Sequence, residues 1–246
     1  MIRWSFIELD EVRSTQEVAR GLAAEGAPEG TTVVAKSQIS GTGRLGRRWL
    51  SPEGGLYLSF VLRPDQIALP ELATIVSTTA VAEGIEKSTG LAPTIRWPND
   101  VMLGGKKLAG VIAEAQASGG VVSSIIVGIG VDCNRRSAGL QSLGGEATTV
   151  EEELGRPVAI PEVMRSILGS FSVLYARWAA GEDVREEWTR RVATLGKQVL
   201  VKLKTEENPF SCTATALEDD GSLSISLAGR GRVVRAEDLE WLREQS

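Results

Sequence analysis

The sequence predicts an α+β protein in which a mixed β-sheet packed with helices is followed by a small C-terminal SH3-like β-barrel. Up to residue 195, apolar runs of strand length are interleaved with segments whose apolar residues recur at helical spacing. From residue 196 onward, apolar residues alternate and tight glycine turns separate the runs, which is typical of a small barrel. We therefore expect a first domain over residues 1–195 and a barrel over residues 196–246.

The composition excludes several classes of protein. The chain has 246 residues, of which 42% are hydrophobic and 24% charged, as in a soluble globular protein. The net charge of −5 argues against DNA as a partner. No apolar run approaches the roughly 20 residues of a membrane span. We therefore expect no contact with a membrane. Two cysteines, Cys133 and Cys212, are too few for a disulfide framework, so we expect a cytoplasmic protein.

Histidine is absent from the sequence. Its absence excludes catalysis by a serine–histidine or cysteine–histidine pair, and it excludes most zinc sites. Any chemistry must therefore use carboxylates, amines, guanidinium groups, backbone donors or a hydrated metal ion.

The chain begins with a strand expected at residues 2–9 and a helix that ends at Gly26. Ser14 and Glu17 fit a capping box at the start of this helix, with Ser14 as the N-cap. Capping is the simpler role for Ser14 and Thr15, although hydroxyl groups at a helix start could also bind a polar ligand.

A glycine-rich loop joins the strands expected at residues 31–37 and 56–62. Gly41, Gly43 and Gly46 spell G-x-G-x-x-G, the glycine pattern of dinucleotide sites. A dinucleotide site needs a helix after the glycines, whereas a strand follows here. We therefore reject a Rossmann interpretation of this loop.

Arginines alternate with these glycines, and a tryptophan closes the run: Arg44, Arg47, Arg48 and Trp49. Guanidinium groups recognise phosphate or carboxylate through paired donors, and glycines let a backbone approach a ligand closely. The loop is therefore suited to closing over an anion, and an ordinary glycine-rich surface turn is the alternative.

A predicted hairpin forms the second dense segment. Gly104 and Gly105 are typical of a two-residue turn, which would bring Asp100 close to Lys106 and Lys107. Because neighbouring strand residues point to opposite faces, only one of the two lysines can face a site.

The next strand, expected at residues 121–131, ends in Asp132 and Asn134. An acid and an amide at a strand end could hold a metal ion or a ribose, and a turn with side-chain caps is the alternative. Helical spacing predicts the remaining elements before the barrel, at residues 70–90, 147–155, 161–178 and 184–195.

Taken together, these segments resemble the motifs of the biotin protein ligases. Residues 38–49 resemble the adenylate-binding loop of that family, residues 96–100 its K-W-P-N-D segment, residues 107–111 its K-L-A-G strand, residues 128–134 its G-I-G-x-N-x-N segment, and residues 14–15 the start of its S-T-N segment. The resemblance covers nearly the whole chain, in order and with compatible spacing.

The resemblance implies a fold like that of the class II aminoacyl-tRNA synthetases and biotin ligases, and a reaction in two steps. Biotin and ATP, accompanied by Mg²⁺, would give biotinyl-5′-AMP, from which biotin passes to a lysine of a biotin carboxyl carrier domain in a biotin-dependent carboxylase. The family's N-terminal DNA-binding domain has no counterpart before the first strand, so we expect a ligase without repressor activity, either a monomer or a homodimer.

The resemblance also assigns residues. The biotin-binding residues would be Ser14, Thr15, Gln16, Gln38 and Gly110. The adenylate-binding residues would be Gly41, Thr42, Gly43, Arg44, Gly46, Arg47, Trp49, Asn99, Lys107, Asp132 and Asn134. Lys107, Arg44 and Asp100 would be catalytic, with Asp100 orienting or deprotonating the acceptor amine, and no metal ligand is assigned.

Four positions depart from the family pattern: Gln16 replaces asparagine, Thr42 the first loop arginine, Arg96 lysine and Asp132 an asparagine. Two alternatives stay open. A lipoate–protein ligase would share the fold and the lysine strand, but it would need a long apolar tunnel. A biotin- or nucleotide-binding protein without catalysis would explain Thr42 and Asp132, whereas the presence of Asp100 and Lys107 argues against it.

Overall fold

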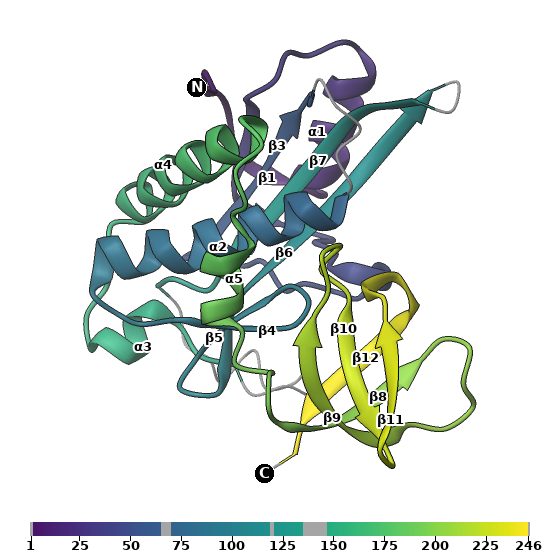
Figure 1. The fold of residues 1–246 in the computed structure, drawn as a ribbon. Helices are drawn as coiled ribbons and strands as arrows, with labels where there is room; N and C mark the ends of the chain where they lie inside the picture. Colours follow the sequence, from purple (N-terminus) through teal and green to yellow (C-terminus); the bar gives the residue numbers. More distant parts are fainter. Residues whose placement is uncertain (1, 65–69, 119–120, 135–146, 246) are drawn as a thin grey trace.

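A computed structural model describes residues 2–64, 70–118, 121–134 and 147–245. In this part of the chain, one sheet has the strand order β1-β2-β3-β7-β6-β5-β4 and a second has the order β11-β10-β9-β8-β12 (Figure 1). Strand β1 pairs with β2 in parallel, and the other pairs of the larger sheet are antiparallel. The predicted α+β class with a C-terminal β-domain is confirmed.

The elements have these bounds. The larger sheet consists of β1 (Ser5–Val12), β2 (Thr31–Gln38), β3 (Leu56–Leu62), β4 (Thr94–Arg96), β5 (Asp100–Leu103), β6 (Lys106–Ser118) and β7 (Val121–Val131). The helices are α1 (Thr15–Ala24), α2 (Pro70–Thr89), α3 (Val150–Leu154), α4 (Ile160–Ala179) and α5 (Arg185–Arg191), with short 3₁₀ turns η1 (Arg44–Gly46) and η4 (Ala236–Asp238). The smaller sheet consists of β8 (Gln198–Leu203), β9 (Phe210–Leu217), β10 (Leu223–Leu227), β11 (Arg230–Val234) and β12 (Leu239–Glu244).

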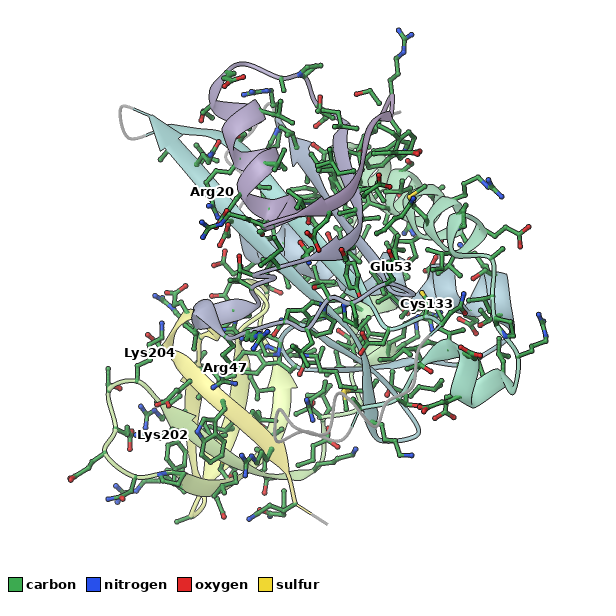
Figure 2. All side chains as sticks on the ribbon, turned by 180° about the vertical axis from the view of Figure 1, so that it is seen from behind. Arg20, Arg47, Glu53, Cys133, Lys202 and Lys204 are labelled. Carbon is green, nitrogen blue, oxygen red and sulfur yellow. The ribbon has the colours of Figure 1, made fainter. Side chains whose placement is uncertain are left out.

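Strand β3 lies between β2 and β7 in the larger sheet and is buried along its whole length. Because strand side chains alternate, Phe60 packs into the core that α2 and α4 cover, whereas Val61 packs against α1 on the opposite face. Figure 1 shows α2 and α4 across one face, and Figure 2, turned by 180°, shows α1 on the other. The face that carries α1 is also the face on which the candidate site is built.

Gly84 on α2 lies close to the backbone of α4. A Cβ added there would lie 2.5 Å from the backbone Cα of Ile167. We expect Gly84→Ala to push the two helices apart and to lower the free energy of unfolding by about 1–3 kcal/mol, as overpacked cores do. Gly169→Ala on α4, where an added Cβ meets nothing within 4 Å, is the matched control. Equal midpoints of urea unfolding for the two variants would contradict this packing.

The apolar core of the smaller sheet includes side chains from before residue 195. Trp97, at the end of β4, and Trp188, on α5, are buried in the same cluster as the barrel strands. The indole Nε1 of Trp97 donates to the carbonyl of Gly221 at 2.9 Å. The domain boundary near residue 195 therefore stays a prediction, because side chains on both sides of it share one core.

Three predicted elements differ in extent. The first strand runs over Ser5–Val12 rather than residues 2–9, because it pairs with β2 as far as Gln38. The helix expected at residues 184–195 covers only Arg185–Arg191. The one expected at residues 147–155 covers only Val150–Leu154, with Thr149 as its N-cap.

Candidate active site

A cavity of about 1140 Å³ opens between the α1 face of the larger sheet, the loop that joins β2 to β3 (residues 39–55, the arginine loop) and β12 of the smaller sheet. It brings together most of the residues that the sequence predicted: Ser14, Thr15, Gln16, Gln38, Thr42, Gly43, Arg44, Arg47, Trp49, Asn99, Asp100, Lys107, Gly110 and Asp132. Gly46 lines an adjoining cavity that shares the arginine loop. Asn134 lies apart, because its amide nitrogen donates to the Val158 carbonyl and its amide oxygen accepts from the Val158 backbone N–H.

Polar groups from three elements form one end of the cavity. The backbone N–H and the hydroxyl of Thr15 donate to Oε1 of Gln38 at 2.8 and 3.1 Å, and Nε2 of Gln38 donates to the hydroxyl of Ser51 at 2.8 Å. Since the Thr15 hydroxyl has only one proton, the Ser59 hydroxyl 2.9 Å away must donate to it. Sequence reasoning missed Ser51 and Ser59, because they lie in apolar or loop segments without a motif.

Ser14 stands at the N-cap position of α1, but its side chain makes no capping hydrogen bond, so the predicted capping box is wrong. The side chain is 2% exposed and lines the cavity instead. The polar role that the sequence left open as the alternative for Ser14 is therefore the one its position favours.

Two paired glycines leave room above the sheet, and Trp49 fills that room. Gly110 on β6 is paired with Gly130 on β7. A Cβ on Gly110 would lie 3.3 Å from the Trp49 ring, and one on Gly130 would lie 2.5 Å from its Nε1. This Nε1 is buried without a hydrogen-bond partner among the described residues. Trp49 thus anchors the loop to the sheet in this structure.

Lys107 and Asp100 meet across the predicted hairpin. The ammonium group of Lys107 forms an ion pair with Oδ1 of Asp100, and Nη2 of Arg96 lies 2.7 Å from Oδ2 of the same carboxylate. The Lys107 ammonium also lies 5.2 Å from the centre of the Trp49 ring. The juxtaposition of Asp100 with a lysine is therefore confirmed.

The environment of Asp100 holds its carboxylate in the charged form. Burial by itself would raise the pKa of Asp100, but the charges and hydrogen bonds of Lys107 and Arg96 outweigh it and leave the pKa below its ordinary value of 3.8. These ion pairs therefore stabilise the fold above about pH 4, and the contribution is lost as the pH falls through the lowered value. A carboxylate with a lowered pKa is a weak base, which argues against deprotonation of an amine by Asp100.

A β-bulge determines which lysine faces the cavity. Pairing between β5 and β6 shifts between Val101 and Met102, so that Leu108 is an extra residue on β6. Strict alternation from Gly110 would have placed Lys106 on the cavity face. The bulge reverses the alternation, and the Lys107 ammonium lies 3.6 Å from where a Cβ of Gly110 would be. Lys106 is exposed.

The arginine loop is docked on the barrel. Arg44 donates to the carbonyl of Ala236 in η4 and to Oδ1 of Asn99 at 3.4 Å. Arg47 donates to the carbonyl of Glu240 at 2.7 Å, and Figure 2 shows it between the loop and the barrel. Burial lowers the pKa of the Arg44 guanidinium, against the opposing charge of Asp100. Sequence reasoning missed the barrel carbonyls, since backbone acceptors leave no signal in a sequence.

The described residues contain no group of three acidic, cysteine or histidine side chains placed to hold a metal ion. The carboxylates of Asp100 and Asp132 line the cavity, and Asp132 is 3% exposed. Oxygen donors suit Mg²⁺, which commonly binds one or two carboxylates together with substrate phosphates.

A cationic loop and a lysine strand over one polar cavity are features of an enzyme that binds a carboxylate and a nucleotide together. Residues 9–132 match the model of the Biotin/lipoate A/B protein ligase family, so this chain belongs to that family. It is 34% identical over 236 residues to the bifunctional ligase/repressor BirA of Bacillus spizizenii, and the aligned region covers 94% of this chain and 72% of that protein.

Two further comparisons cover nearly complete proteins. The chain is 32% identical over 226 residues to a biotin–[acetyl-CoA-carboxylase] ligase of Paracoccus denitrificans, and the aligned region covers 87% of this chain and 92% of that protein. Its structure resembles that of the biotin protein ligase of Aquifex aeolicus in complex with biotin and ATP, with a TM-score of 0.84, 30% identity, and coverage of 98% and 99% of the two chains.

Proposed function

We propose that this protein ligates biotin to a specific lysine of a biotin carboxyl carrier domain, with ATP as the source of energy and biotinyl-5′-AMP as the intermediate. The observation that carries the proposal is one cavity lined by the Thr15–Gln38 network, Lys107 and Arg44. These are the residues that the sequence assigned to biotin, to the reacting groups and to the adenylate. Relatives named biotin–[acetyl-CoA-carboxylase] ligases support a carboxylase carrier as the acceptor.

In the first step, an oxygen of the biotin carboxylate attacks the α-phosphorus of ATP, and pyrophosphate leaves. Negative charge develops on the phosphate oxygens, and a preorganised cation lowers the barrier. Lys107 supplies that cation, since Asp100, which also pairs with Arg96, holds the ammonium group beside Gly110. Mg²⁺ would neutralise the pyrophosphate when bound, and Asp132, which lines the cavity, would be one of the carboxylates that hold it.

In the second step, the amine of the acceptor lysine attacks the carbonyl carbon of the anhydride, an amide forms, and AMP leaves. The incoming amine must lose a proton, and the lowered pKa of Asp100 makes this carboxylate a poor acceptor for it. We therefore assign Asp100 as a positioning residue that holds Lys107, rather than as the group that orients or deprotonates the acceptor amine, the role expected from the sequence.

The polar end of the cavity suits a ureido ring. Ser14, Thr15 and Gln38 offer hydroxyl and amide groups, and a ureido ring has two N–H donors and a carbonyl acceptor. The dithiolane ring of lipoate has neither. A site built from hydrogen-bonding groups rejects an analogue that leaves these groups unpaired.

The partners and location follow from the same proposal. The carrier domain is the protein partner, and the net charge of −5 is unfavourable for DNA. None of the helices in the described part of the chain is long and apolar enough to cross a membrane. We propose a cytoplasmic enzyme that is either a monomer or a homodimer.

Adenylate retention tests the role of the loop. Incubation with biotin, ATP and Mg²⁺ but no carrier should yield biotinyl-5′-AMP bound to the protein. Arg44 lines the cavity from the arginine loop. Arg44→Ala should therefore release the adenylate about tenfold faster, the change expected for one lost charge-assisted hydrogen bond. Its effect on the dissociation constant for biotin should be smaller.

The control is Arg13→Ala, which removes an exposed arginine that pairs with Glu17. If Arg44→Ala releases the adenylate at an unchanged rate, Arg44 does not retain the adenylate and only connects the loop to the barrel. Failure of the unmodified protein to form any biotinyl-5′-AMP would refute the proposed reaction.

A further inference from the structure

Two consecutive residues of β6 are buried in the same core, and this irregularity turns Lys107 toward the cavity. Leu108 and Ala109 are both 0% exposed, and both belong to the core cluster that α2 and α4 cover. In a regular strand only one of two neighbouring side chains can point to a given face. The orientation of Lys107 therefore depends on the contacts that hold the backbone in this bulged conformation.

Strand β7 does not extend along the bulge. Its pairing with β6 begins at Ala109, so the backbone of Lys107 needs another partner on this side. The residues just before α3 supply it. The backbone N–H of Thr148 donates to the Lys107 carbonyl at 3.0 Å, and Ala147 forms a parallel bridge with Lys107. The segment before α3 thus takes the place of β7 beside the lysine.

The side chain of Thr148 is fixed as well as its backbone. Thr148 is 1% exposed, and its hydroxyl donates to Oε1 of Glu153 on α3 at 2.6 Å. The next residue, Thr149, caps the same helix by accepting a hydrogen bond from the backbone N–H of Glu152 at 3.1 Å. Figure 1 shows α3 at the same end of the larger sheet as β5. Helix α3 therefore holds the residue that pairs with Lys107.

The same segment also holds the strand end that carries Asp132. The backbone N–H of Val150 donates to the Asp132 carbonyl at 2.9 Å, and the backbone N–H of Asp132 donates to the Leu108 carbonyl at 2.9 Å. The start of α3 thus connects the backbones of Lys107 and Asp132, whose charged groups both line the cavity.

We propose that Thr148 is a positioning residue for adenylate formation. Its N–H and its Glu153-bound hydroxyl hold the backbone of Lys107, so that the bulge keeps the ammonium group on the cavity face. Thr148 does not itself line the cavity and acts through Lys107. This inference rests on the proposed biotin ligation and adds to it a residue from the start of α3.

The test is the rate of biotinyl-5′-AMP formation in a single turnover, with biotin and ATP both saturating. Thr148→Pro removes the N–H donor and should lower this rate at least about tenfold, because displacement of a reacting group by about 1 Å can cost on the order of a hundredfold. Thr148→Val keeps the N–H but loses the hydroxyl, and should lower the rate about threefold, as expected for one weakened hydrogen bond. Thr148→Ser keeps both groups and should retain nearly the full rate.

A double-variant cycle separates positioning from a structural role. In a Lys107→Ala background, Thr148→Pro should cause no further loss of rate, because the group that Thr148 positions is gone. If Thr148→Pro does not fold, Thr148→Val is used in the same cycle. The matched control is Thr215→Val on β9, which removes an exposed hydroxyl that donates to the Ser224 carbonyl at 3.0 Å and should leave the rate unchanged.

Two results would overturn the inference. One is an unchanged rate in folded Thr148→Pro or, where that variant does not fold, in Thr148→Val. The other is an equal loss of rate from the Thr148 change with and without Lys107, since that pattern indicates a structural role alone. The unmodified protein is measured in the same assay, so failure of the proposed function would appear there separately, as an absence of biotinyl-5′-AMP.

Discussion

Lys107→Ala should abolish most adenylate formation. Asp100 holds the Lys107 ammonium beside Gly110, where we expect charge to develop as the biotin carboxylate attacks the α-phosphorus. Loss of such a preorganised group typically costs about 2.7–4 kcal/mol of transition-state stabilisation, or roughly a hundred- to a thousandfold in rate. Lys107→Arg should restore only part of the rate, because the planar guanidinium fork does not replace a compact ammonium.

The measurement is biotin-dependent pyrophosphate release, with Lys106→Ala as the matched control on the same strand. Lys106 is exposed, so its alanine variant should retain nearly the full rate. The assignment depends on the bulge at Leu108, which turns Lys107 rather than Lys106 toward the cavity. A crippled Lys106→Ala beside an active Lys107→Ala would show that the strand register is wrong.

Asp100→Asn should slow both half-reactions. The carboxylate of Asp100 binds Lys107 and Arg96 at once, and an amide would leave both cations without their counter-charge. A displacement of about 1 Å at a reacting group can cost on the order of a hundredfold in rate, and we expect a loss of that order in adenylate formation and in transfer from pre-formed adenylate.

The control is Asp10→Asn, which removes an exposed carboxylate that pairs with Lys36 at 2.7 Å. If Asp100→Asn slows only the transfer step, Asp100 acts on the acceptor amine, as the sequence alone suggested. An unchanged rate in both steps would remove Asp100 from the active site.

The elements around the site were predictable where the local pattern determines them. The apolar run at residues 56–62 predicts a strand, and the structure has β3 over Leu56–Leu62. Gly104 and Gly105 predict a two-residue turn, and both have positive φ, at +56° and +79°. That turn brings Asp100 and Lys107 together. These features depend on residues close in sequence, so no knowledge of the tertiary structure was needed.

Features that depend on tertiary contacts were not predictable. The bulge at Leu108 arises from pairing with β5 and leaves no mark in the sequence. Arg44 and Arg47 contact barrel carbonyls about 190 residues away, at Ala236 and Glu240. The capping box is a local sequence pattern, so it predicted that the Ser14 side chain caps α1. In the structure this side chain makes no capping hydrogen bond and lines the cavity, which is formed by segments distant in sequence.

The mass of a carrier domain tests the central claim most directly. The protein is incubated with ATP, Mg²⁺, a biotin carboxyl carrier domain and either biotin or lipoate, and the carrier is weighed by mass spectrometry. Our account predicts that the carrier gains one biotinyl group and no lipoyl group, and that a carrier with its acceptor lysine replaced by arginine gains neither. Gain of a lipoyl group alone, or no gain in mass while biotin and ATP bind to the protein, would contradict it.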